Sequence, residues 1–411
     1  MSTGRESSRP RRAEVLLAGA IDRPGLAAAR SLSRRGVSFV VLGRRQPDFV
    51  ASSRHVRRYV PGPNPNEDPD GFLDAVVRVC AEYDVRLVIP MEDAALALCS
   101  EHRGALPEGT TLAAAGVDAV RNVLDKRENL ETANRLGIPC PAEFALENRD
   151  QTAELVERLG FPMVLKNPGR PPGTSTLAHG FKWVIAHDER ELEALLQKHT
   201  GDERFPLFQE LVEGQVTNLC CFAASGQVVA IHQYRSLRRM GWEGNSILRE
   251  ATPSTPELVE HAERLLGDLR WDGVAQVAFI VRKRDGASWY METNGRFWGS
   301  VEGSIAIGWD FPYWTYRYFT RGELPTPPLL KVGSKACWHF ADLRLLGRRW
   351  QGIEPPVPPR PGRLRAVADY LTGFAPGVHS DVFALDDPLP ELVEHLAGIR
   401  RALGRRLSRS R

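Results

Sequence analysis

The sequence predicts two fold classes in succession, an N-terminal α/β domain and then an α+β region of paired antiparallel strands. Strand-like and helix-like segments alternate from residue 13 to about residue 115, an order typical of a parallel sheet. Two later pairs of strand-like segments meet at Ser225-Gly226 and at Asp285-Gly286, where the glycine favours a tight hairpin turn.

The N-terminal segments have the length and apolar pattern of a Rossmann-like layer. The expected elements are strands at 14–20, 37–45 and 86–93 and helices at 26–36 and 68–85. Asp70 is the expected N-cap of the second helix. Because "GAIDRPG" (19–25) lacks the GxGxxG spacing, a structural role is favoured over dinucleotide binding.

The central segments are assigned by the same criteria, the spacing of apolar residues and the turn residues that separate the segments. The expected elements are helices at 120–137, 152–160 and 255–271, strands at 161–168 and 205–214, and hairpins at 216–237 and 273–294. The stretch "GRPPGTSTLAHG" (169–180) is a loop by its Gly, Pro, Ser and Thr content. A strand and helix are expected over 335–346, a proline-rich connector over 353–363, and a basic helix at the C-terminal end.

Composition excludes several classes of protein. The 411 residues predict about two to four domains, and a net charge of +3 gives no reason to expect nucleic acid as a partner. No apolar run has membrane-spanning length. The six cysteines form no CxxC pair, which predicts reduced core thiols in a cytoplasmic protein.

Polar residues with strand periodicity stand out near residue 290. In "YMETNGRFWGS" (290–300), Glu292, Asn294 and Arg296 occupy alternate positions, so we expect their side chains on one face of a strand. Lys126 on a helix, Lys166 at a strand end and "QELVEG" (209–214) precede them in order.

This order resembles the ATP-grasp superfamily, specifically its carbamoyl-phosphate-synthetase-like carboxylate–amine ligases. The matching segments are "DKRENLETANRLGIPCP", "FPMVLKNP", "FQELVEG", "HQYRSLRRMGWEGNSILRE" and "METNGRFWGS", within a resemblance that spans about 13–320. It implies a Rossmann-like pre-ATP-grasp domain followed by a two-lobed ATP-grasp fold. The expected divisions are a disordered tail (1–12), the Rossmann-like domain (13–115), the ATP-grasp domain (116–325, with a small lobe at about 150–230) and a C-terminal extension (326–411).

The resemblance also implies the chemistry and the residues that serve it. ATP converts a carboxylate into an acyl phosphate, and an amine then displaces phosphate to give an amide. The implied ATP-binding residues are Lys126, Lys166, Thr174, Ser175, Gln209, Glu210, Leu211, Val212 and Glu213. The implied ligands of one or two Mg²⁺ ions are Glu292 and Asn294. The implied catalytic residues are Arg296 and Arg249, and the implied substrate-binding residues are Arg235 and Arg249.

Two positions depart from the family pattern. The family usually has a glutamate on the first strand of the metal hairpin, and this chain has Ala278 there. Gln276, two positions earlier, is a candidate neutral oxygen ligand on the same face. The acid that often binds the ribose is replaced by Val216, which leaves Glu213 as a candidate for that role.

Three functions remain open on the sequence alone. The first is the ligase, acting on a small-molecule carboxylate and an amine without nucleic acid or membrane, as a monomer or a homodimer. The second, motivated by Ala278 and Val216, is a degenerate ATP-grasp protein that binds nucleotide without turnover. The third, a Rossmann-type oxidoreductase, is disfavoured by the missing fingerprint. His232 is expected to be a packed or surface residue rather than a base, while Arg238 and Arg239 remain open between site and surface.

Overall fold

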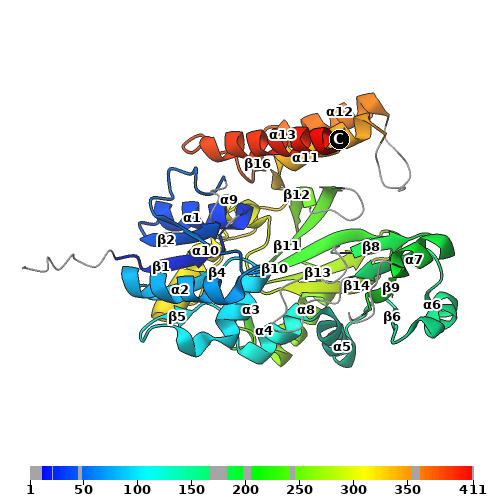
Figure 1. Cartoon of the computed structure of the whole chain (residues 1–411), viewed down its shortest axis with the longest axis horizontal. Helices are drawn as coiled ribbons and strands as arrows, with labels where there is room; N and C mark the ends of the chain where they lie inside the picture. The colour runs from blue at the N-terminus through cyan, green and yellow to red at the C-terminus, as the bar shows by residue number, and fades with distance from the viewer. Residues whose placement is uncertain are drawn as a thin grey trace, which may run out of the picture. The chain divides into compact units, whose positions relative to one another are not determined.

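The computed structural model describes residues 12–20, 22–44, 49–166, 183–197, 205–240, 246–352 and 362–409. Figure 1 labels the helices and strands. The described residues divide into two compact units. Unit 1 contains the described residues of 1–114, 312–324 and 383–411, and unit 2 contains those of 115–311 and 325–382. Among the described residues, no helix is long and apolar enough to cross a membrane.

Unit 1 is built on a parallel sheet with the strand order β3-β2-β1-β4-β5. Its strands are β1 (Val15–Ala18), β2 (Phe39–Arg44), β3 (Tyr59–Gly62), β4 (Leu87–Pro90) and β5 (Thr111–Leu112). Its helices are α1 (Arg23–Arg34), α2 (Pro69–Tyr83), α3 (Asp93–Glu101), most of α10 (Phe311–Arg321) and α13 (Leu389–Arg409). The predicted Rossmann-like layer is confirmed, because successive strands pair in parallel with helices between them.

Side-chain caps begin two helices of this unit. Asp22 accepts a hydrogen bond from the Arg23 amide (2.8 Å) at α1, and Asp68 accepts one from the Gly71 amide (3.0 Å) at α2. The prediction of Asp70 as the N-cap of α2 is therefore wrong. Asp70 lies in the first turn instead, where its charge still suits the helix dipole.

The start of α13 is tied to α1 by a buried ion pair. Arg30 Nε lies 2.9 Å from Asp387 Oδ2, and the two side chains are almost fully buried. The Ser53 hydroxyl donates to the same carboxylate oxygen at 2.5 Å. This contact joins residues more than 300 positions apart, so the last helix belongs to the N-terminal unit.

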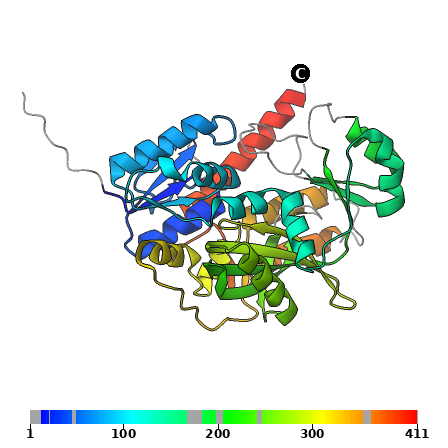
Figure 2. The ribbon, with the colours of Figure 1, turned by 90° about the horizontal axis from the view of Figure 1, so that it is seen from below.

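Unit 2 contains a small antiparallel sheet with the order β6-β9-β7-β8. Its strands are β6 (Glu143–Ala145), β7 (Met163–Lys166), β8 (Trp183–Ala186) and β9 (Leu207–Glu210), and its helices are α6 (Thr152–Leu159) and α7 (Glu189–Leu196). Leu155 of α6 and Leu192 of α7 pack in one apolar cluster with Phe144 and Phe208 of the strands. The two helices therefore cover one face of this sheet (Figure 2).

The larger sheet of unit 2 has the order β14-β13-β10-β11-β12-β15-β16. Its strands are β10 (Gln215–Ala224), β11 (Gln227–Arg239), β12 (Ser246–Thr252), β13 (Gly273–Val281), β14 (Ser288–Asn294), β15 (Lys335–Cys337) and β16 (Val378–Ser380). The remaining helices are α4 (Val117–Leu124), α5 (Lys126–Arg135), α8 (Pro256–Asp268), α9 (Val301–Ala306), α11 (His339–Trp350) and α12 (Arg363–Leu371). Both predicted hairpins are confirmed, with positive φ at Gly226 and Gly286 in their turns.

Two predicted segments are organised differently from the expectation. The single helix expected over 120–137 is two helices, because Asp125 ends α4 and caps α5 by accepting from the amides of Arg127 and Glu128. The expected extension (326–411) contributes β15, α11, α12 and β16 to unit 2 and α13 to unit 1. The expected tail (1–12) and connector (353–363) lie almost wholly outside the described residues.

Candidate active site

The strand register sorts the side chains of the large sheet onto two faces. One row of directly paired residues crosses five strands: Ala251, Tyr234, Asn218, Ala278 and Glu292. Because successive strand residues point to opposite faces, Arg249, His232, Gln276 and Asn294 lie on the same side as this row. We call this side the site face of the large sheet.

Glu292 and Asn294 lie side by side on the site face. Asn294 Nδ2 is 3.4 Å from Glu292 Oε1 and 3.4 Å from Gln276 Oε1. The prediction that Glu292 and Asn294 share a face is confirmed. Three oxygen-bearing side chains thus meet at the edge of the sheet, and such oxygens are the ligands that Mg²⁺ prefers.

Arg296 does not continue this strand. β14 ends at Asn294, and the Arg296 guanidinium donates from Nη1 to the Phe297 carbonyl at 3.1 Å. The prediction that Arg296 extends the strand alternation is therefore wrong, because the chain turns two residues earlier than expected. Phe297 and Trp298 are buried, and the Trp298 ring packs edge-on against Phe311 at 5.0 Å between centroids. These aromatic residues therefore belong to the buried core of unit 2.

Two lysines bring positive charge toward Glu292. Lys126 is the first residue of α5, and Lys166 is the last residue of β7, as predicted. Burial lowers the pKa of Lys166 to about 8; the Glu292 carboxylate opposes this shift and the Lys126 ammonium adds to it. Lys166 therefore lies within electrostatic reach of both side chains, although they come from three separate elements.

At the end of β9, the side chain of Glu210 already accepts a hydrogen bond within the protein. Glu210 Oε1 accepts a hydrogen bond from the Ala142 amide at 3.0 Å, while Gln209 is buried and Glu213 is exposed. Val212 is buried and Leu211 is half-buried. At Gly214 a Cβ would lie 2.4 Å from Ile280 Cγ2, so glycine is required where this segment crosses β13. The predicted loop residues Thr174 and Ser175 lie outside the described residues.

The structure places the two departures from the family pattern in buried positions. Ala278 pairs directly with Glu292 and is only 4% exposed, so the neighbour that a second carboxylate would occupy is a methyl group. Gln276 donates from Nε2 to the Tyr234 hydroxyl at 2.8 Å, with its carbonyl oxygen turned toward Asn294. Val216 is buried, so its apolar side chain offers a ribose no hydrogen bond.

The two arginines predicted to bind substrate lie on opposite faces. Arg249 pairs with Asp381, and both side chains are buried. Arg235 pairs instead across the strand with Glu250, 2.8 Å from Nη2 to Oε2, and its side chain is 46% exposed. The strand register therefore places Arg249 on the site face and Arg235 on the opposite face.

Two further charged residues lie near the candidate site: Arg239, which the sequence left open between site and surface, and Glu143, which was not among the expected site residues. Arg239 is half-buried at the end of β11; burial lowers its pKa to about 10, and the Glu292 carboxylate opposes that shift. Glu143 pairs with Gln209 in the small sheet, and burial raises its pKa while Lys166 and Arg127 oppose the rise. Arg238, by contrast, is bound to Asp342 of α11 at 2.5 Å and serves the scaffold.

His232 is packed, which is one of the two positions expected for it. Its Nε2 is 2.9 Å from the Ser304 hydroxyl, and its ring meets Trp309 edge-on at 5.0 Å. Burial lowers the pKa of His232 to about 4, and the Gln233 amide opposes this only in part. The ring is therefore neutral near pH 7, where it can accept or donate one hydrogen bond at each nitrogen.

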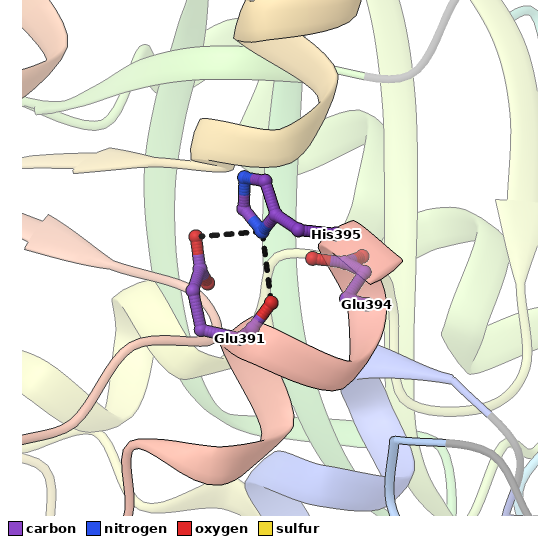
Figure 3. Close-up of side chains that lie close together, drawn as sticks. All are labelled: Glu391, Glu394 and His395. Atoms are coloured by element: carbon purple, nitrogen blue, oxygen red, sulfur yellow. Dashed lines mark hydrogen bonds and ion pairs between the residues drawn. The ribbon is translucent and has the colours of Figure 1, made fainter. Parts of the chain in front are cut away.

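A further group of metal-ligand types lies in unit 1, on α13 (Figure 3). Glu391, Glu394 and His395 come within 4.8 Å of one another through single ligand atoms. His395 Nδ1 is 2.8 Å from the Glu391 carbonyl and 3.7 Å from its carboxylate. A carbonyl oxygen accepts only from a protonated nitrogen, so Nδ1 is the donor in this contact and only Nε2 could keep a lone pair. We interpret this group as an internal contact of the helix.

Comparison with known proteins identifies the fold. No protein-family model and no curated protein match this sequence. Among solved structures, the biotin carboxylase of Campylobacter jejuni superposes with a TM-score of 0.61 at 14% identity, over 78% of this chain and 74% of that one. The L-amino acid ligase of Bacillus licheniformis gives 0.57 at 18%, over 77% and 75%. The N5-carboxyaminoimidazole synthetase of Staphylococcus aureus in complex with ADP gives 0.57 at 14%, over 82% and 85%.

The chain has an ATP-grasp fold. It spans only 30% of another structural match, the Rhizobium etli pyruvate carboxylase, at a TM-score of 0.60. Lys166 lies in the small sheet and Glu292 in the large sheet, and the small sheet (143–210) begins and ends earlier than the small lobe expected at about 150–230.

Proposed function

We propose that this chain is an ATP-dependent carboxylate–amine ligase. The observation that carries the proposal is the meeting of Glu292 and Asn294 with the positive charge of Lys126 and Lys166 on an ATP-grasp fold. The solved structures that share the fold include a ligase of amino acids and an ADP-bound synthetase. Fold alone does not fix activity, so the weight rests on these side chains.

The reaction has two balanced steps. A carboxylate oxygen of the first substrate attacks the γ-phosphorus of ATP, and the bond to the β-phosphate oxygen breaks to release ADP. The amine nitrogen of the second substrate then attacks the acyl carbon, phosphate leaves with the bonding pair, and the nitrogen loses a proton to solvent. Positive charge at the transferring phosphoryl group lowers both barriers.

The side-chain oxygens of Glu292, Asn294 and Gln276 fit Mg²⁺, with one carboxylate among the three. Glu292 and Asn294 would hold the ion, with the Gln276 carbonyl oxygen as a third neighbour. When bound, the ion would neutralise charge on the phosphates. Lys126 and Lys166 bind phosphate oxygens in this proposal, Arg239 supplies positive charge near Glu292, and Arg296 acts on the transferring phosphoryl group. Gln209 and the backbone at Leu211 and Val212 contact the adenine, and Glu213 contacts the ribose.

The decisive test is product formation. Purified protein with ATP, Mg²⁺ and a panel of acids and amines should release ADP and phosphate together with an amide, and hydroxylamine should capture the acyl phosphate as a hydroxamate. Glu292→Ala and Lys166→Ala should abolish each product. Unchanged turnover in both variants would overturn the proposal.

A second candidate function, nucleotide binding without turnover, is favoured by Ala278 opposite Glu292. Calorimetric titration of ATP with and without Mg²⁺ separates the two. Tighter binding with Mg²⁺ supports the ligase; binding that ignores Mg²⁺ favours the binding protein. Ala278→Glu restores a carboxylate beside Glu292, so it should tighten Mg²⁺ binding in either case.

The compartment, the substrate type and the oligomeric state of the enzyme are also proposals. All six cysteines are free, which fits a reducing compartment such as the cytoplasm. We expect small-molecule substrates only, and light scattering after gel filtration would decide between a monomer and a homodimer.

A further inference from the structure

The last helix, α13, carries large apolar side chains on its exposed face. Four of them, each 50–56% exposed, are Leu389, Leu392, Leu396 and Ile399. We call these four residues the α13 stripe. In the same stretch the buried residues are Pro390 and Glu394. A helix at a protein surface ordinarily buries its apolar stripe and exposes its acids, so this helix has the reverse pattern.

The start of α13 is fixed to the rest of unit 1, so the stripe does not belong to a loose tail. Besides its pair with Arg30, Asp387 accepts a hydrogen bond at Oδ1 from the Arg54 amide at 2.9 Å. Arg34 Nη2 donates to Asp386 Oδ1 at 3.1 Å. These residues and α13 all belong to unit 1. An apolar face displayed on an anchored helix is typical of a contact surface.

The spacing of the stripe is that of a helix-pairing seam. Its residues recur at intervals of three, four and three positions, which correspond to the a and d positions of a heptad repeat. The helix has 21 residues, enough for three heptads. Phe383 and Leu385, 45% and 91% exposed, extend the apolar surface just before the helix. The partner that fits such a narrow seam is another helix.

The stripe is complementary to itself when two copies run antiparallel. If Leu392 of one chain lies opposite Leu396 of a second copy, Leu389 lies opposite Ile399 of that copy, because both pairs are centred on position 394. Each contact then occurs twice about a two-fold axis. A second copy of this chain therefore offers the matching seam without any further partner.

The charges along the segment also favour an antiparallel second copy. Positions 386–394 hold four acids and no base, while positions 400–411 hold six arginines and no acid. In the arrangement above, Arg400 lies level with position 388 of the second copy, about 4.5 Å along the axis from its Glu391. A parallel pair would instead bring the two arginine-rich segments together, at a cost in repulsion.

We propose that α13 is a self-association surface, on which a second copy of this chain docks in antiparallel orientation. The inference does not depend on the proposed ligase activity. An anionic membrane would attract the arginines of the helix, but it would repel the acids beside its first two leucines. A second copy matches both halves. Because one helix pair buries less area than a permanent interface, the dimer should dissociate on dilution.

Sedimentation velocity of the full chain over an about 100-fold range of concentration measures this association. We expect a shift from monomer to dimer and no larger species, because a two-fold contact closes on itself. The variant Leu392→Glu/Leu396→Glu places charges at the centre of the seam. It should weaken dimerisation at least about 100-fold. Both leucines are half-exposed in the single chain, so the monomer should remain folded by circular dichroism.

The matched control changes exposed leucines outside α13. Leu324 and Leu329 are 56% and 94% exposed, and Leu324→Glu/Leu329→Glu adds the same charge to the chain. This control should dimerise as the wild type does. Equal weakening in both double variants would show a general effect of charge and would overturn the proposal, as would full dimerisation in Leu392→Glu/Leu396→Glu.

The orientation has a test of its own. Leu392→Lys and Leu396→Glu should each weaken the dimer when studied alone. In an equal mixture of the two variants, an antiparallel pair brings the new lysine against the new glutamate and leaves the other central layer as two leucines. The mixture should therefore associate more tightly than either variant alone. A mixture no tighter than its components would rule out the antiparallel pairing.

Two further results would overturn the proposal. The first is a wild-type chain that stays monomeric at every concentration. The second is a monomer that binds vesicles of phosphatidylcholine and phosphatidylserine through the stripe, with binding lost in Leu392→Glu/Leu396→Glu, because the face would then belong to a membrane surface. Dimerisation with no such vesicle binding would support the assignment.

Discussion

The two faces of the large sheet place the same residue types in different surroundings, buried on one face and half-exposed on the other. On the site face, Arg249 is 3% exposed, is paired with the fully buried Asp381 and borders a cavity. On the other face, Arg235 is half-exposed and paired with Glu250, one position along the strand from Arg249. The comparison teaches that the parity of a strand position, rather than the residue type, separates a site residue from a surface residue here.

The largest expected effect comes from breaking the buried pair. Arg249→Met leaves Asp381 as an uncompensated buried charge, so the free energy of unfolding should fall by about 3–5 kcal/mol. Urea denaturation of the full-length variant and of the wild type measures this change. The double variant Arg249→Met/Asp381→Asn removes the stranded charge and should recover much of the loss. A double variant as unstable as the single one would show that Asp381 has another role.

The second effect contrasts two glutamates on the two faces. Glu292→Gln keeps the shape of the side chain but removes its charge, so the Mg²⁺-dependent part of ATP affinity should fall about 100-fold. The matched control, Glu250→Gln, removes a carboxylate from the other face and should leave that dependence unchanged. Calorimetry with and without Mg²⁺ provides both values. Equal losses in the two variants would remove Glu292 from the metal site.

The third effect concerns protons at Lys166. Its pKa of about 8 in the unbound protein lies below the ordinary value of 10.5, because burial disfavours the ammonium. Bound phosphate raises that pKa, so ATP binding near pH 8 should take up part of a proton. Above pH 8 the affinity should fall by up to about tenfold per pH unit, because the neutral amine must first be protonated.

Titrations in buffers of different ionisation enthalpy measure this uptake. It should vanish in Lys166→Met and persist in Lys283→Met, which changes an exposed lysine in the turn of the β13–β14 hairpin. Proton uptake that survives in Lys166→Met would place the titrating group elsewhere.

The parts of this structure that were predictable are those determined by local pattern. Both hairpins, the strand that ends at Lys166 and the shared face of Glu292 and Asn294 follow from periodicity and turn residues. The position of Ala278 opposite Glu292 also follows, because both lie on one hairpin.

The parts that were missed depend on distant partners or on the exact ends of elements. Arg249 forms an ion pair with Asp381, which lies 132 residues later, and no local sequence pattern predicts such a pair. β11 and β12 are irregular between Ser236 and Arg239, so the faces of residues beyond that point cannot be counted from the sequence. Asp125 and Asp68 are caps whose roles depend on where the chain turns, and the sequence offers acids on either side.

The smallest expected effect completes the comparison on the outer face. Arg235→Met removes a half-exposed ion pair, which is worth between 0 and about 1 kcal/mol and is screened by salt. Its stability should therefore differ from the wild type by less in high salt than in low salt, and its ATP affinity should not change. Urea denaturation at two ionic strengths tests the first point, and the titrations above test the second. A loss of ATP affinity in Arg235→Met would mean that charge on the outer face also contributes to nucleotide binding.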